Sequence, residues 1–274
     1  MENPSSSSGR IITLLTDFGS QDYFAGAMKG VILSINSSAR IVDITHEVPP
    51  QDIQAAAFNL LAAYTAFPAG TVHVAVVDPG VGSDRKPLAV QCAGQFFVGP
   101  DNGIFSWICE REGKSRAIHL RNESFFHHPV STTFHGRDIF APVAAALSRG
   151  AAVEELGEPL SDPVSLPSLA LKQHPDGQAE ARIIHIDRFG NCVTNLTREH
   201  VSEDSFAAGV KLSVNGREVS AGRRFFAAST GEQNELFGIF GSAGFLEIAA
   251  QNASAASILK ARCGDPVLLN SATT

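Results

Sequence analysis

The first 150 residues alternate between short apolar runs and segments with apolar residues at helical spacing, and this order constrains the fold more than any other feature. Strands are expected at Arg10–Thr16, Arg40–Thr45 and Thr71–Val77, with helices at Tyr23–Asn36 and Asp52–Phe67 between them. A β-α-β-α-β order is typical of a mostly parallel sheet with helices on its faces. The sequence therefore predicts an N-terminal α/β domain over residues 10–150.

The last hundred residues have a different pattern, with short strand signals separated by glycine-rich turns. Asn215-Gly216 stands between two such signals and is a strong indicator of a β-hairpin. Residues 180–270 are therefore expected to form a smaller antiparallel, barrel-like β domain. The proline-rich residues 151–179 are expected to be a linker, and the serine-rich residues 1–9 a flexible tail.

Charge, hydropathy and cysteine usage argue against a nucleic-acid-binding, membrane-spanning or secreted protein. The net charge of −7 disfavours nucleic acid as a partner, because phosphate binding needs a basic face. No apolar window approaches the length of a membrane span, and the start of the chain does not have the pattern of a signal peptide. The cysteines are far apart and form no CxxC pair, which favours reduced core residues in a cytoplasmic protein and gives no metal motif. They are Cys92, Cys109, Cys192 and Cys263.

Asp78 is the first candidate functional residue. It follows a strand whose last residues, ending at Val77, are all apolar, as in a strand that is buried on both faces. Ligands of open α/β sheets bind beyond the carboxyl ends of such strands. A Gly-Pro turn separates Asp78 from Arg85, so the guanidinium can return to the carboxylate and keep it ionised. The alternative is an ion pair that only holds the loop.

Asp17 and His135 are the next candidates in this half of the chain. Asp17 ends the first strand, where a carboxylate can accept hydrogen bonds from both hydroxyls of a ribose, although it could equally cap the next helix. His135 precedes Gly136, which lets a ligand come close to the backbone, and a histidine there can carry a proton near neutral pH. The alternative for His135 is a capping or surface residue.

The C-terminal half adds a second group of candidates. Asp187 again places a carboxylate at the end of a strand before a tight turn, where it could accept from an ammonium group. In the same turn, Asn191 could read a base edge and Phe189 could stack on it. Ser242 lies in a loop of small residues that could hold a carboxylate. Plain turns are the alternative explanation for both segments.

Five motifs occur in one order along the chain, and together they are more specific than any one of them. They are Thr16-Asp17-Phe18-Gly19, Val77-Asp78-Pro79-Gly80-Val81-Gly82, Phe134-His135-Gly136-Arg137-Asp138-Ile139-Phe140-Ala141-Pro142, Asp187-Arg188-Phe189-Gly190-Asn191 and Gly241–Ala249. In this order the chain resembles the S-adenosyl-L-methionine (SAM) hydrolases that form adenosine. That family is also called SAM hydroxide adenosyltransferase and is related to the SAM-dependent fluorinase and chlorinase. The resemblance runs from Ile11 to Leu269.

The resemblance implies an N-terminal α/β domain, a smaller C-terminal β domain and a homotrimer. SAM would bind between the N-terminal domain of one subunit and the C-terminal domain of its neighbour. Water or hydroxide would attack the ribose C5′ and release L-methionine and adenosine. The substrate would be SAM itself, with no cofactor and no metal ion.

The resemblance also implies roles for individual residues of the N-terminal domain. Asp78, Arg85 and His135 match the catalytic triad of the hydrolases, and Asp17 matches the acid that binds the ribose. Because the sulfonium is already a good leaving group, the catalyst mainly has to orient an oxygen nucleophile. Asp78 and His135 would position the water and accept its proton, while Arg85 would hold Asp78.

The remaining substrate-binding candidates lie in the C-terminal domain. By resemblance, Asp187 and Ser242 hold the amino and carboxylate groups of the methionine part. Asn191 contacts the adenine, with Phe189 beside it. Glu247, in the same motif as Ser242, is the last candidate for substrate binding.

Two departures bear on the alternatives. The halide-using relatives have non-acidic residues in place of the triad and an inserted loop, whereas here Val90–Val98 continues without a long insertion, which favours water over halide. Some relatives carry an arginine near the end of the last motif, where this chain reads Ala249-Ala250-Gln251-Asn252. A SAM-dependent halogenase and a non-catalytic adenosine or SAM sensor remain the alternatives.

Overall fold

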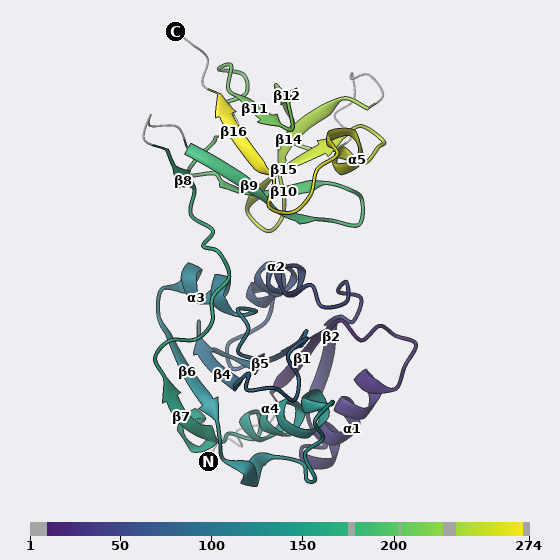
Figure 1. Cartoon of the computed structure of the whole chain (residues 1–274), viewed down its shortest axis with the longest axis vertical. Helices are drawn as coiled ribbons and strands as arrows, with labels where there is room; N and C mark the ends of the chain where they lie inside the picture. The colour runs from purple at the N-terminus through teal and green to yellow at the C-terminus, as the bar shows by residue number, and fades with distance from the viewer. Residues whose placement is uncertain (1–9, 175–178, 203, 227–233, 271–274) are drawn as a thin grey trace, which may run out of the picture. The chain divides into compact units, whose positions relative to one another are not determined.

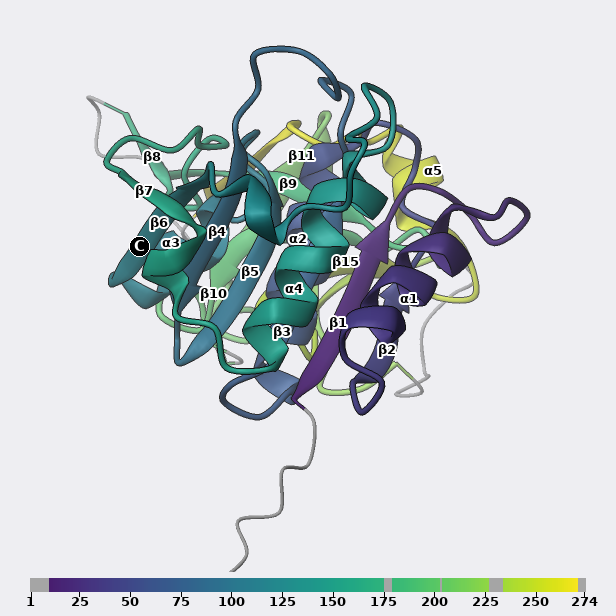
Figure 2. The ribbon, with the colours of Figure 1, turned by 90° about the horizontal axis from the view of Figure 1, so that it is seen from below.

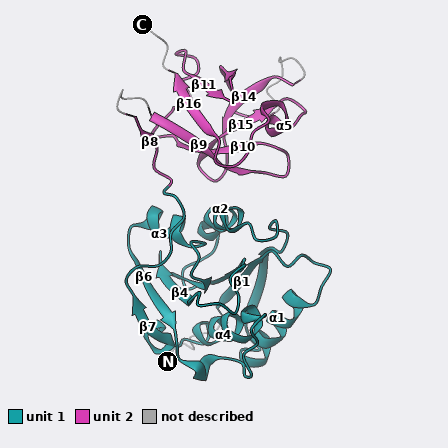
Figure 3. Cartoon of the chain, viewed as in Figure 1, with its two compact units in different colours: residues 1–168 teal, residues 169–274 magenta. Residues whose placement is uncertain are grey.

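The computed structural model describes residues 10–174, 179–202, 204–226 and 234–270. The chain divides into two compact units, one that ends at Ser168 and one that begins at Leu169 (Figures 1 and 3). Each unit has its own sheet and its own core, so each is described by itself.

Unit 1 is built on a seven-stranded sheet with the order β2-β1-β3-β5-β4-β6-β7. The strands β2, β1, β3 and β5 are parallel neighbours, while β4, β6 and β7 continue the sheet in antiparallel pairs. Their bounds are β1 Ile11–Thr16, β2 Arg40–Thr45, β3 Val72–Val76, β4 Pro87–Cys92, β5 Gln95–Pro100, β6 Ser115–Leu120 and β7 Gly157–Leu160. The expected N-terminal α/β domain is confirmed, with an antiparallel extension at one edge.

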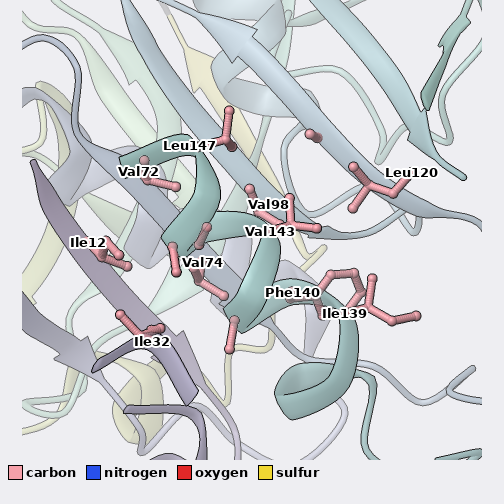
Figure 4. Packing of buried hydrophobic residues seen from close by; sticks show 14 of the residues in the cluster. Ile12, Ile32, Val72, Val74, Val98, Leu120, Ile139, Phe140, Val143 and Leu147 are labelled. Carbon is pink, nitrogen blue, oxygen red and sulfur yellow. The ribbon is translucent and has the colours of Figure 1, made fainter. Parts of the chain in front are cut away.

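Helices cover both faces of this sheet, as the view in Figure 2 shows. They are α1 Phe24–Ile35, α2 Ile53–Ala63, α3 Ser106–Glu112 and α4 Ala141–Ser148. Asp52 caps α2, since its side chain accepts a hydrogen bond from the backbone N–H of Ala55 at 2.8 Å. On one face, α4 packs its apolar side against the middle of the sheet, where Val143 and Leu147 lie near Val74 and Val98 (Figure 4).

Unit 2 is a curved sheet with the order β12-β11-β16-β9-β10-β15-β14-β13, and β8 pairs with β9 beside this path. All its pairs are antiparallel except β13 with β14, so the expected barrel-like antiparallel domain is confirmed. The bounds are β8 Lys172–Gln173, β9 Ala179–Ile186, β10 Cys192–Thr197, β11 Lys211–Val214, β12 Arg217–Val219, β13 Ala221–Gly222, β14 Leu236–Phe240, β15 Phe245–Ala250, α5 Ala255–Leu259 and β16 Pro266–Asn270.

Several local features differ from the sequence-based expectations or refine them. Residues 151–179, expected as a linker, contain both β7 and β8. A wide π-helical turn over Gly136–Phe140 leads directly into α4. Asn215 and Gly216 both have positive φ, at 49° and 75°, which confirms the hairpin turn between β11 and β12.

The four cysteines are not all core residues. Cys92 and Cys192 are buried, Cys109 is half-buried and Cys263 is exposed, so the expectation of a core position is wrong for Cys263. None of the four is joined in a disulfide. In the part of the chain that the structure describes, no helix is long and apolar enough to cross a membrane.

Candidate active site

Asp78 and Arg85 form a nearly buried ion pair at the carboxyl end of β3. Arg85 Nε donates to Asp78 Oδ1 at 3.1 Å, and Arg85 Nη2 donates to Asp78 Oδ2. The side chains are only 6% and 8% exposed, respectively. The intervening turn is closed by backbone hydrogen bonds from Val81 to Asp78 and from Ser83 to Gly80. This two-point pairing holds the carboxylate plane in one orientation, as the sequence predicted.

His135 completes the cluster through the other side of Arg85. Arg85 Nη2 lies 2.9 Å from His135 Nδ1. Because a guanidinium can only donate, Nδ1 must be the acceptor, and a neutral His135 therefore carries its hydrogen on Nε2. Burial, and then the positive charge of Arg85, lower the pKa of His135 below its usual value, although Asp78 and Asp138 act in the opposite direction. The ring is therefore neutral at pH 7.

Arg85 connects these two side chains and also has an aromatic neighbour. Its guanidinium carbon lies 5.5 Å from the ring centroid of Phe140, within range of a cation–π contact. Its Nη1 is buried and finds no hydrogen-bond partner among the residues that the structure describes. Arg85 is thus held by Asp78, His135 and Phe140 together.

The loop that carries His135 is held by Asp138, a fully buried carboxylate. Asp138 Oδ2 accepts from the backbone N–H of Ser131 at 2.8 Å, and Arg137 forms an ion pair with the same side chain. The loop also lies against the turn after Asp78. A Cβ atom placed on Gly82 would be only 2.3 Å from the carbonyl oxygen of Thr132, and Gly82 has a φ of +77°. The two loops therefore meet with no room between them.

Asp17 lies in the same pocket as Asp78 and His135. Its Oδ2 accepts from the backbone N–H of Gln51 at 2.8 Å. The pocket has a volume of about 450 Å³, and Asp17, Gln51, Asp78 and His135 are among its lining residues. The structure thus brings the predicted ribose-binding acid and two members of the predicted triad into one cavity. Arg85 does not line the cavity but contacts both Asp78 and His135, which do.

An aromatic wall closes one side of this pocket. Phe134 lies edge-on to Phe24 and Phe18, with ring centroids 5.1 and 6.0 Å away, and Phe18 and Phe24 are 5.6 Å apart. All three side chains line the cavity. The site therefore combines two acids and a neutral imidazole with a low-polarity surface large enough for a sugar ring.

In unit 2, Asp187 organises its own turn. Its Oδ1 accepts from the backbone N–H groups of Phe189 and Asn191, and its Oδ2 accepts from Asn191 Nδ2, at 2.8–2.9 Å. Phe189 is 78% exposed. Both Phe189 and Asn191 line a second pocket of about 540 Å³, together with Phe226 and Ala250. The structure therefore brings the predicted base-binding pair together in this pocket. Asp187 holds the turn that carries them but does not line the pocket itself.

Ser242 and Glu247 differ in their surroundings. Ser242 is exposed on the turn between β14 and β15 and lines neither of the two pockets described above. Glu247 lies on β15, where its carboxyl contacts Gly241 so closely that a Cβ atom there would be 1.7 Å from Oε1. Burial, and secondarily the charge of Asp187, raise the pKa of Glu247 to about 7. Glu247 and Asp187 are therefore close enough for the charge of one carboxylate to disfavour ionisation of the other.

We expect Glu247→Gln to raise the thermal unfolding temperature at pH 8 and to change it much less at pH 5. In the unfolded chain the carboxyl has its ordinary pKa, so between about pH 4.5 and 7 the folded chain retains a proton that the unfolded chain has lost. Stability from this group therefore falls as the pH rises through that window, and an amide does not ionise. Glu218→Gln, a change at an exposed residue of β12, is the control. An equal effect of Glu247→Gln at both pH values would contradict the expectation.

Several lining residues were not predicted from the sequence, among them Gln51 and Phe226. Gln51 follows two prolines and has a φ of +67°, which turns its N–H toward Asp17. Only the Pro49-Pro50 pair could have indicated an unusual backbone there. Phe226 carries no pattern that distinguishes it from a core residue. Among the described residues, no three His, Cys, Asp or Glu side chains are grouped as metal ligands.

Comparison with known proteins places these features in one family. The model of the SAM hydroxide adenosyltransferase N-terminal domain matches residues 12–157, and that of the C-terminal domain matches residues 181–268. An (R)-S-adenosyl-L-methionine hydrolase of Methanocaldococcus jannaschii is 38% identical over 91% of each chain. A fluorinase of Nocardia brasiliensis is 25% identical over 90% of this chain and 92% of its own.

A solved structure shows the same architecture. An uncharacterized conserved protein from Thermotoga maritima superimposes with a TM-score of 0.85 at 36% identity. The match covers 94% of this chain and all of that one. The likeness therefore extends over both units rather than over the α/β unit alone.

Proposed function

The chain belongs to the SAM hydroxide adenosyltransferase family, and we propose that it hydrolyses (R)-S-adenosyl-L-methionine to adenosine and L-methionine. The observation that carries this proposal is the cluster of Asp78, Arg85 and His135 beside Asp17 in one pocket. The fluorinase relatives are more distant, which supports water rather than halide as the nucleophile.

In the proposed reaction, an oxygen nucleophile attacks C5′ in line with the C5′–S bond. The new C5′–O bond forms as the C5′–S bond breaks, and the bonding pair goes to the sulfur of methionine. His135 donates its Nε2–H to the oxygen of the nucleophile, because Nδ1 is already engaged by Arg85. Asp78 retains lone pairs beyond those used by Arg85 and takes the proton of the water. This assigns the proton to Asp78 alone, where the sequence-based expectation also included His135.

Substrate binding in this proposal uses both units. Asp17 accepts the ribose hydroxyls in unit 1, beside the aromatic wall. In unit 2, Phe189 and Asn191 contact the adenine, since both line the second pocket. Asp187 accepts from the methionine ammonium group and Ser242 binds its carboxylate, with Glu247 beside Asp187.

The assembly and location of the enzyme also remain proposals. A homotrimer, with each site shared between unit 1 of one subunit and unit 2 of the next, would bring the two sets of residues together. The molecular mass of the chain in solution, measured by light scattering, tests it. The prediction of a cytoplasmic protein rests on the wide spacing of the cysteines in the sequence and stays a prediction.

We expect kcat/KM to fall on acidification with a midpoint below pH 6.5. Protonation of His135 would place a hydrogen on Nδ1, against the donating Nη2 of Arg85, and the triad would separate. Because the pKa of His135 is lowered, the neutral ring persists below the usual titration range. His135→Gln keeps a donor near the position of Nε2 without titrating, so its profile should lose this limb. A midpoint above pH 6.5 would contradict the proposed neutral donor.

The direct test is to incubate the purified full-length chain with SAM alone and to separate the products by chromatography. We expect equal amounts of adenosine and methionine, with the (R) epimer at sulfur consumed faster than the (S) epimer. Parallel samples contain chloride or fluoride. Formation of a 5′-halogenated adenosine would favour the halogenase, and no product after prolonged incubation at high enzyme concentration would favour a sensor.

A further inference from the structure

The segment that carries Asp17 is held by two side chains that the proposed chemistry does not use, the buried Thr16 and the half-buried His46. We propose that Thr16 and His46 are positioning residues, which hold the Asp17-Phe18-Gly19 segment so that the Asp17 carboxylate faces the ribose diol. The inference rests on the proposed role of Asp17 in substrate binding. Neither Thr16 nor His46 lines the pocket, so both act through Asp17.

The side-chain part of this arrangement centres on Thr16, the last residue of β1, which is fully buried. Its Oγ1 lies 2.8 Å from His46 Nδ1 and accepts from the backbone N–H of Phe18 at 3.2 Å. The hydroxyl therefore connects the end of the strand, the ring of His46 and the residue directly after Asp17. A valine in this place would have the same shape and neither contact.

The backbone of the segment after β2 provides the second half of the arrangement. The carbonyl oxygen of His46 accepts from Gly19 N–H at 2.8 Å, and Val48 N–H donates to the carbonyl of Thr16 at 3.4 Å. Gln51 N–H donates directly to Asp17 Oδ2. His46 thus contacts the chain on both sides of Asp17, through its ring at Thr16 and through its carbonyl at Gly19.

The far side of the His46 ring fixes its hydrogen positions. Nε2 lies 3.2 Å from Asp43 Oδ1, within ion-pair distance, and it has no hydrogen-bond partner in the described part of the chain. Asp43 in turn pairs with Lys29 at 2.6 Å. The negative charge of Asp43 favours a hydrogen on the nearby Nε2, and in a neutral ring with that tautomer Nδ1 accepts from Thr16. The Thr16 hydroxyl then donates its hydrogen to His46 and accepts from Phe18 N–H with its oxygen, so each donor meets an acceptor.

A second threonine–histidine pair, between β1 and β3, provides an example of a purely structural contact. Thr13 Oγ1 lies 2.7 Å from His73 Nδ1, and both residues are fully buried. Thr13 lies in the middle of β1, three residues before Thr16, and His73 faces it from β3; among the described residues, neither side chain hydrogen-bonds to the Asp17 segment. The pair offers a matched control for the loss of one buried hydroxyl–imidazole contact.

The decisive experiment compares Thr16→Val, Thr16→Ser and Thr13→Val in the full-length chain with SAM as substrate. Thr16→Val removes both contacts of the hydroxyl and should raise the KM for SAM at least about tenfold, the size expected for one lost buried hydrogen bond, with kcat within about threefold of wild type. Thr16→Ser should restore the wild-type KM. Thr13→Val should lower the unfolding temperature without changing KM.

Variants of His46 distinguish the contributions of its two ring nitrogens. An asparagine amide can occupy the position of Nδ1, and a glutamine amide that of Nε2. His46→Asn should therefore keep the KM near wild type, whereas His46→Gln should raise it as Thr16→Val does. Equal KM values for Thr16→Val and Thr13→Val, or a loss confined to kcat in Thr16→Val, would overturn the positioning role.

A readout without substrate keeps this test separate from the proposed function. Amide hydrogen exchange of Phe18 and Gly19, followed by NMR in the unliganded chain, should be faster in Thr16→Val and unchanged in Thr13→Val. If the wild-type chain does not consume SAM, the proposed function fails, while the exchange rates still decide whether Thr16 orders the segment. Unchanged exchange in Thr16→Val would overturn the inference even in an active enzyme.

Discussion

Asp78→Asn should lower kcat for adenosine formation by about 10²- to 10⁴-fold, the range for loss of a positioned base. The amide has one accepting oxygen in place of two, so it cannot receive both Arg85 donors and the proton of water. Its NH₂ group would also face the guanidinium, donor against donor. Initial rates of adenosine release at saturating SAM measure the effect.

Two controls distinguish chemistry from folding in this variant. Asp84→Asn removes an exposed carboxylate from the same loop and should leave kcat unchanged. The unfolding temperature of Asp78→Asn should fall, because Arg85 is nearly buried and loses its counter-charge. A folded Asp78→Asn protein with kcat within tenfold of wild type would remove Asp78 from the proposed mechanism.

Gly82→Ala should lower both stability and activity, although Gly82 touches none of the proposed reacting groups. A non-glycine residue at a φ of +77° is strained, and the new Cβ would lie 2.3 Å from the carbonyl oxygen of Thr132. Left-handed strain and overpacking together predict a loss of about 2–4 kcal/mol in the free energy of unfolding. Since the two loops must separate, His135 moves away from Asp78, and a misplacement of about 1 Å can lower kcat about 100-fold.

The matched control for this variant is Gly80→Ala in the same turn. Gly80 has no left-handed φ, and a Cβ there would be 3.4 Å from its nearest neighbour, the hydroxyl of Ser83. Its stability and activity should stay close to wild type. Chemical denaturation and steady-state rates of both variants check the expectation, and equal behaviour of the two would show that the loops do not need their close contact.

Much of the α/β unit could be predicted from sequence because its signals are local. The apolar run before Asp78 and the periodic segments between strands give β1, β2, β3 and their helices almost to the residue. The acids Asp17 and Asp78 follow from their places at strand ends. The position of β7 could not be predicted, since its pairing with β6 depends on contacts between residues about forty positions apart.

The finer features of the site depend on long-range contacts that no local pattern encodes. The sequence suggested that Arg85 pairs with Asp78, seven residues away, but not that the same nitrogen reaches His135, fifty residues away. That second contact decides which ring nitrogen bears the hydrogen and so which residue takes the proton. Similarly, His46 stands in an ordinary strand-end sequence, and its relation to Asp17 emerges only when β1 and β2 lie side by side.

The aromatic wall of the unit 1 pocket lowers the polarity around the reacting groups, and this affects the reaction rate. The carboxylate of Asp78 and the sulfonium ion carry opposite charges, and both are neutralised as the water gives up its proton and the C5′–O bond forms, so the transition state is less polar than the reactants. Water stabilises the reactants more than the transition state and thereby slows such a reaction. Phe18, Phe24 and Phe134 replace part of that water with hydrocarbon. The wall would therefore accelerate charge annihilation while contributing no reactive group of its own.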